Sequence, residues 1–79
     1  MIFIRDMEDK EIIEFIQSIL DPSDIETLNF SNKIVNQENR RSSLRSFFHN
    51  ENIFNKINPV VDPTRLCSEI FIKGAHYEF

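Results

Sequence analysis

The amino-acid sequence predicts an α+β fold that is mostly helical, with a small sheet joining the N-terminal and C-terminal segments. Three observations support this prediction: a strongly amphipathic segment near the N-terminus, several shorter segments with helical apolar spacing, and two similar β-prone triplets at opposite ends. The 79 residues form a single domain, residues 1–79, because a chain of this length cannot build two cores. The alternative is a small all-α bundle in which the second triplet belongs to a helix.

The N-terminal part of the chain combines a β-prone start with the clearest helical pattern. Residues 2–4 (Ile-Phe-Ile) are β-prone, and Asp6 is a suitable helix cap. Residues 7–20 then predict an amphipathic helix, because their apolar residues fall on one arc of about 160°. That arc contains Ile12, Ile13, Phe15, Ile16, Ile19 and Leu20.

The middle of the chain predicts several short helices. Asp21-Pro22 ends the first helix, since the residue before proline avoids helical angles, and Ser23 with Glu26 forms a capping box for the next. Residues 36–43 are all polar and predict either a loop or a fully solvated helix. Apolar residues at helical spacing return in residues 44–48 and 53–57, separated by the polar residues 49–52.

Two predictions compete for the C-terminal third. Asp62 as a cap, Pro63 at the first helical position and Gly74 as terminator favour a helix. The second prediction has a strand at 69–73, a turn at Gly74-Ala75 and a last strand at 76–79. We favour the second, because residues 70–72 repeat the Ile-Phe-Ile triplet of residues 2–4 and an N-terminal strand needs a partner.

Composition excludes several classes of protein. Gly74 is the only glycine, so the chain contains no glycine-rich phosphate loop and no dinucleotide-binding fingerprint. No apolar run reaches the roughly 18 residues needed to cross a bilayer, so no membrane role is expected. A single cysteine and no signal-peptide pattern favour a reducing, cytoplasmic location.

The residues able to carry catalysis are few and scattered. His49, His76 and Cys67 lack the spacing of a metal site, and we expect no metal and no other cofactor. Cys67 lies among apolar residues at helical spacing, as a structural cysteine does, so we assign no nucleophile and no catalytic residue. The sequence therefore predicts a protein that is not an enzyme.

Charge is segregated along the chain, whose net charge is −4. Residues 1–30 hold eight acidic against two basic residues, whereas residues 31–48 hold four basic against one acidic residue. An acidic face beside a basic segment is typical of a protein that binds a charged partner. The candidate partner-binding residues lie on the first helix, in the basic segment and in the aromatic tail: Glu8, Glu11, Glu14, Arg40, Arg41, Arg45, Tyr77 and Phe79.

These features favour a small non-enzymatic inhibitor or regulator that binds a protein and occludes its surface, with a homodimer as one possible assembly. Phage-encoded or mobile-element anti-defence proteins, antitoxins and immunity proteins all fit this description. The contact face would be the first helix, through Glu8, Glu11 and Glu14. The alternative is a small nucleic-acid-binding regulator that uses Arg40, Arg41 and Arg45. The same basic run also resembles a substrate sequence for basophilic kinases at Ser43.

Overall fold

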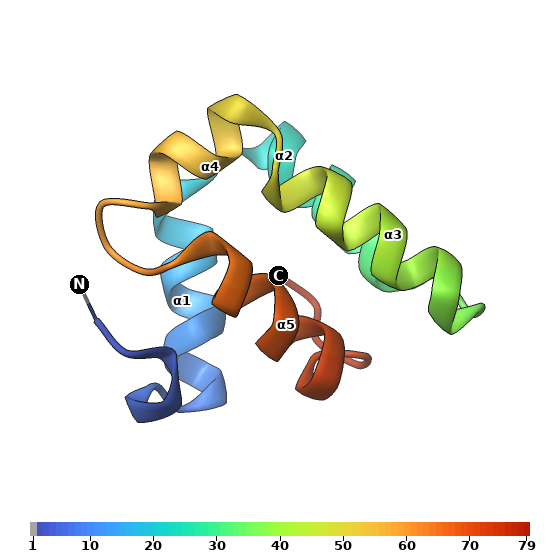
Figure 1. Ribbon diagram of the computed structural model, residues 1–79, viewed down its shortest axis with the longest axis horizontal. Helices are drawn as coiled ribbons and strands as arrows, with labels where there is room; N and C mark the ends of the chain where they lie inside the picture. The colour runs from blue at the N-terminus through green and yellow to red at the C-terminus, as the bar shows by residue number, and fades with distance from the viewer. Residues whose placement is uncertain (1) are drawn as a thin grey trace.

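The computed structural model describes residues 2–79, and this part of the chain is all helical, with no strand. One 3-10 helix and five α-helices follow one another along the chain (Figure 1). They are η1 (Ile4–Asp6), α1 (Asp9–Ile19), α2 (Pro22–Asn32), α3 (Gln37–Phe48), α4 (Glu51–Ile57) and α5 (Pro63–Lys73). The fold is thus the small all-α bundle rather than the α+β fold that we favoured.

The helices enclose one core. α3 packs along α2, to which residues 33–36 connect it, and also against α4 and α5, while η1 contacts α5. In Figure 1, α1 lies on the left, α4 crosses the top and α5 lies in front of the centre, where the C-terminus also ends. Each α-helix contributes fully buried apolar side chains, among them Ile16, Leu28, Phe48, Ile57 and Ile70.

The predicted sheet is absent because each of its two triplets has another role. Residues 70–72 lie inside α5, whose N-terminus has both expected signals: Asp62 accepts a hydrogen bond from the Thr64 amide (3.0 Å), and Pro63 follows it. At the other end, the Ile2 amide donates to the Val60 carbonyl (2.8 Å), in the connection between α4 and α5. The N-terminal segment thus bonds to this connection, and its Ile4 begins η1, so it forms no strand.

Helix boundaries differ from the prediction where local caps decide them. α1 starts after Glu8 rather than after Asp6, because Glu11 accepts a hydrogen bond from the Glu8 amide (3.0 Å). α2 starts at Pro22 with Asp21 as its N-cap, two residues before the expected cap Ser23, so the predicted capping box of Ser23 and Glu26 is not formed. The polar residues 37–43 form the first half of α3, and Asn36 caps the helix. The prediction of a helix for this run is confirmed, but the helix is not fully solvated, because Arg40 is buried.

The C-terminal residues fold back onto α2. The Asn32 amide donates to the carbonyl of Gly74 (2.7 Å), and the Phe79 amide donates to the side chain of Asn29 (2.9 Å). Phe79 is 8% exposed, and its ring meets that of Tyr77 edge to face. The tail therefore closes one end of the core.

Candidate functional site

Arg40 is the largest of the fully buried side chains, with 1% of its surface exposed. It lies on α3 and forms no ion pair with any carboxylate of residues 2–79. Instead, its guanidinium donates to the Asn32 carbonyl (2.9 Å), the Ile70 carbonyl (2.9 Å) and the Phe71 carbonyl (2.9 Å). Further bonds go to the side-chain oxygens of Asn32 and Gln37, so every nitrogen of the guanidinium is satisfied.

These acceptors explain how a cation can be buried without an anion. The carbonyls of Ile70 and Phe71 lie in the last turn of α5, and that of Asn32 ends α2. The last carbonyls of a helix have no partner within it and lie at the negative end of its dipole. Burial lowers the pKa of Arg40 from its ordinary value, but arginine remains charged in proteins. Arg40 therefore belongs to the fold and offers nothing to a partner.

The position of Arg40 in the sequence carries a signal for this role. Arg40 precedes Leu44, Phe47 and Phe48 by four, seven and eight residues, which places it on the same helical stripe as these buried side chains. An arginine on the apolar stripe of a helix is expected to be buried and to hydrogen-bond within the fold, and not to contact a partner from the surface.

Arg41 and Arg45, by contrast, are exposed and line a small groove between α3 and α5. The groove has a volume of about 160 Å³, and we call it the α3–α5 groove. Its α3 side presents Arg41, Arg45 and His49, and its α5 side presents Cys67, Ser68, Phe71 and Ile72. The Arg41 guanidinium lies 4.5 Å from the centre of the Phe71 ring, within cation–π range.

The three residues considered for catalysis do not meet. Cys67 and His49 line the α3–α5 groove, but they form no hydrogen bond, and the His49 ring stacks on Phe54 with the ring centres 6.1 Å apart. Burial raises the pKa of the Cys67 thiol, and the charges of Arg45 and Arg41 oppose this only in part. His76 lines a different pocket beside the 33–37 segment. This arrangement does not activate the thiol.

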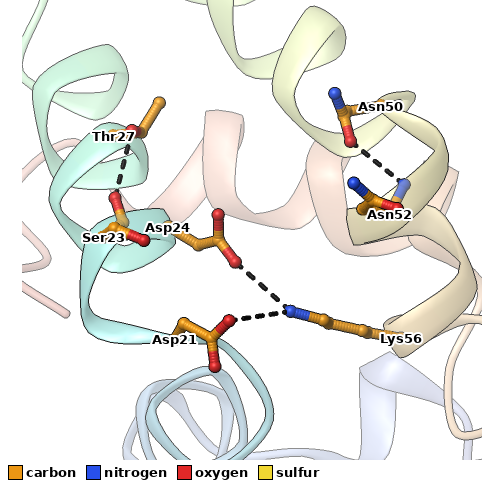
Figure 2. Close-up of polar contacts among 7 residues, drawn as sticks. All are labelled: Asp21, Ser23, Asp24, Thr27, Asn50, Asn52 and Lys56. Carbon is orange, nitrogen blue, oxygen red and sulfur yellow. Dashed lines mark hydrogen bonds and ion pairs between the residues drawn. The ribbon is translucent and has the colours of Figure 1, made fainter.

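A larger and more polar groove, of about 900 Å³, lies between α2, α3 and α4. Figure 2 shows that Lys56 of α4 reaches across it to both Asp21 (3.3 Å) and Asp24 (3.4 Å). The hydrogen bond with Asp21 is the main cause that raises the pKa of Lys56.

Most other polar groups in or beside this larger groove are also engaged. The Asn50 side chain accepts from the Asn52 amide (3.0 Å), and Thr27 donates to the Ser23 carbonyl (3.1 Å), both visible in Figure 2. Ser43 lies within α3 and donates a hydrogen bond to Ser31 of α2 (2.7 Å). It therefore does not lie in an extended, accessible segment of the kind that a kinase requires. The one lysine of this groove thus pairs with both of its carboxylates, and the hydroxyl and amide groups named above are occupied within the fold.

The remaining predicted residues lie on other surfaces. Glu8, Glu11 and Glu14 are exposed on α1, where Glu11 takes part in the cap and Glu14 pairs with Lys10 (3.8 Å). Tyr77 and Phe79 are half-buried and buried, respectively, in the folded tail. The structure therefore brings Arg41 and Arg45 together in one groove and leaves the α1 acids as a separate surface.

Comparisons of this chain with protein-family models, with curated protein sequences and with solved structures found no match. Within residues 2–79, no helix has the length and apolar character needed to cross a membrane. The same part of the chain contains no group of three or more histidine, cysteine, aspartate or glutamate side chains placed to hold a metal ion.

Proposed function

We propose that this protein is a non-enzymatic regulator that binds a protein partner and acts by covering part of its surface. The observation that carries the proposal is the exposed acidic end of α1. Four carboxylates fall within six residues there: Asp6, Glu8, Asp9 and Glu11. Within residues 2–79 none of them forms an ion pair, since Lys10 pairs with Glu14 and Arg5 lies over the Phe3 ring.

This acidic surface favours a basic partner. The positive end of the α1 dipole stabilises acids in the first turn, but that effect is limited to about 0.3–1 kcal/mol for each and leaves the surface anionic. Unneutralised charge of one sign steers association with a surface of the opposite sign and suppresses other partners. A protein whose own basic groove binds nucleic acid has such a surface, as the targets of anti-defence proteins, antitoxins and immunity proteins often do.

The alternative of a nucleic-acid-binding regulator has less support. It requires Arg40, Arg41 and Arg45 to act together, but Arg40 is enclosed by α2, α3 and α5. Two exposed arginines on a chain of net charge −4 release few counterions from nucleic acid. We propose a cytoplasmic location, because a chain with a single cysteine cannot form an internal disulfide and so gains no stability from an oxidising compartment.

The test is charge reversal on α1. Capture of the partner from lysate, followed by mass spectrometry, identifies it, and calorimetry then measures its affinity for the variant Glu8→Lys/Glu11→Lys/Glu14→Lys. We expect at least about a tenfold loss of affinity and a weaker dependence on salt. The control Glu26→Lys/Glu38→Lys/Glu51→Lys makes the same change in net charge at exposed, unpaired acids outside α1.

A folding defect is separated by a milder variant. Glutamine can replace glutamate in a capping box, so Glu8→Gln/Glu11→Gln/Glu14→Gln removes the charges and retains the cap at the start of α1. If partner binding is the same in the wild type, in the α1 reversal and in the control, the acidic end of α1 is not the contact surface and the proposal fails.

A further inference from the structure

The α3–α5 groove holds two neighbouring basic side chains, Arg41 and Arg45, that have no counterion within residues 2–79. All four lysines pair with carboxylates of the chain: Lys10 with Glu14, Lys33 with Glu78, Lys56 with Asp21 and Asp24, and Lys73 with Glu69. Arg41 and Arg45 pair with none within residues 2–79, although the chain has more acidic than basic residues. Two guanidinium groups are therefore left available in one groove.

Their spacing defines what they can bind. Arg41, Arg45 and His49 follow one another at intervals of four residues, so they form a row along one face of α3 that is about 12 Å long. The contact with Phe71 holds the Arg41 guanidinium in place at 4.5 Å from the ring centre, which lowers the entropy lost on binding. Carboxylates one helical turn apart match this row.

The opposite wall of the groove carries an exposed apolar side chain beside the polar Thr64 and Ser68. Ile72 is 72% exposed on α5, next to the half-buried Phe71, and no other part of residues 2–79 covers it. An apolar side chain exposed beside unpaired arginines is a common composition for the centre of a protein interface, where arginine is enriched. An occupant therefore needs an apolar residue next to its acidic ones.

We propose that the α3–α5 groove binds an acidic amphipathic helix of a protein partner. Two of its carboxylates, one turn apart, would accept hydrogen bonds from Arg41 and Arg45, and an apolar residue between them would cover Ile72. Such a helix offers both the charge and the apolar surface, whereas the phosphates of a nucleic acid strand match only the arginines and leave Ile72 without an apolar partner. This second surface is distinct from α1 and extends the proposed function.

A synthetic peptide tests the proposal with the full chain. The probe is an alanine-rich peptide of about 15 residues with two glutamates one turn apart and a leucine between them, titrated into labelled protein and followed by amide chemical shifts. We expect saturable binding with shifts at residues 41–49 and 67–72, and at least about a tenfold weaker binding to Arg41→Ala/Arg45→Ala. A peptide with lysines in place of the glutamates should not bind.

The controls separate charge, folding and other occupants. Arg5→Ala/Arg65→Ala removes the same charge from two other exposed arginines without ion pairs, and should bind the peptide as the wild type does. Ile72→Ser changes an exposed side chain, so it should leave stability unchanged and weaken binding several-fold. The proposal is overturned if the peptide does not bind saturably, or if both double arginine variants lose the same affinity for it. It is also overturned if a single-stranded oligonucleotide binds the same residues more tightly, or if the protein is a homodimer that Arg41→Ala/Arg45→Ala abolishes. Because α1 is unchanged throughout, each of these results leaves the proposed function standing.

Discussion

At the scale of single residues, the hydroxyl of Tyr77 is an exception to the satisfied polar core. It is buried and has no hydrogen-bond partner within the described chain. Burial, and secondarily the nearby carboxylate of Asp9, raises the pKa of Tyr77 from 10.0 to about 12. A buried hydroxyl without a partner costs about 1–3 kcal/mol, so this side chain is held for its ring, which packs on Phe79.

Replacing this tyrosine should therefore not harm the protein. We expect Tyr77→Phe to keep or raise the free energy of unfolding by up to about 1 kcal/mol near neutral pH, measured by urea denaturation. A loss of more than about 1 kcal/mol would show that the hydroxyl is hydrogen-bonded to Asp9 in solution.

The same substitution predicts a difference at alkaline pH. The folded protein keeps the phenol proton up to about pH 12, while the unfolded chain loses it near pH 10.0, so stability falls as pH rises between these values. Tyr77→Phe removes this part of the fall, and the stability difference between the two proteins should widen in favour of the variant across that window. A constant difference would contradict the raised pKa.

At the scale of helices, helical apolar spacing and caps pointed to both α1 and α5. The prediction of α1 is confirmed, whereas the strand favoured at residues 69–73 is wrong. Residues 7–20 leave no ambiguity, since six apolar residues lie on one arc. The triplet 70–72 is compatible with a strand or a helix, because three apolar residues in a row have no period of their own. The N-cap Asp62 and Pro63 at the first helical position favour the helix, and the repeated triplet does not oppose it.

The end of this helix depends on Gly74 for space and not for its backbone angles. Gly74 has φ −90°, which any residue adopts. A Cβ there, however, would lie 2.7 Å from the Ile70 carbonyl oxygen and 3.0 Å from the Tyr77 ring. The sequence indicated the terminator correctly, whereas this close approach depends on the folded tail and had no local signal.

We therefore expect Gly74→Ala to lower the free energy of unfolding by about 1–3 kcal/mol, because the helix end or the tail must shift to admit the methyl group. Thermal and urea denaturation measure the change, and Ala75→Ser at the next, exposed residue should stay within about 0.5 kcal/mol of the wild type. Equal stabilities for Gly74→Ala and the wild type would mean that the tail moves at little cost.

At the scale of the whole molecule, the neighbours Arg40 and Arg41 show why the surface was harder to predict than the helices. Both belong to one polar run, yet Arg40 is 1% exposed and Arg41 faces the α3–α5 groove. Helical spacing could have separated them, but the acceptors of Arg40 come from α2 and from α5, 30 residues further along the chain. Such a site is created by tertiary structure.

Arg40 joins the ends of two helices to a third, so its loss should destabilise the entire fold. Arg40→Met has a similar length but leaves the carbonyls of Asn32 and Phe71 buried without a donor, and leaves that of Ile70 with only the Gly74 amide. We expect it to cost about 3–5 kcal/mol, measured by urea denaturation. For a chain of this size that is a large share of a total of about 5–15 kcal/mol. Arg45→Met, one turn further along α3 and exposed, should change stability by no more than about 0.5 kcal/mol.

If Arg40→Met does not fold, Arg40→Lys provides the comparison, because lysine keeps the charge but cannot donate in the fork geometry that three carbonyls on two helices require. Amide hydrogen exchange should then show the largest loss of protection in the last turns of α2 and α5, since the guanidinium is the donor that the carbonyls of Asn32 and Phe71 share. Full stability in Arg40→Lys would mean that charge at the negative ends of these two helix dipoles is sufficient, and that the hydrogen bonds of the guanidinium contribute little to holding α2, α3 and α5 together.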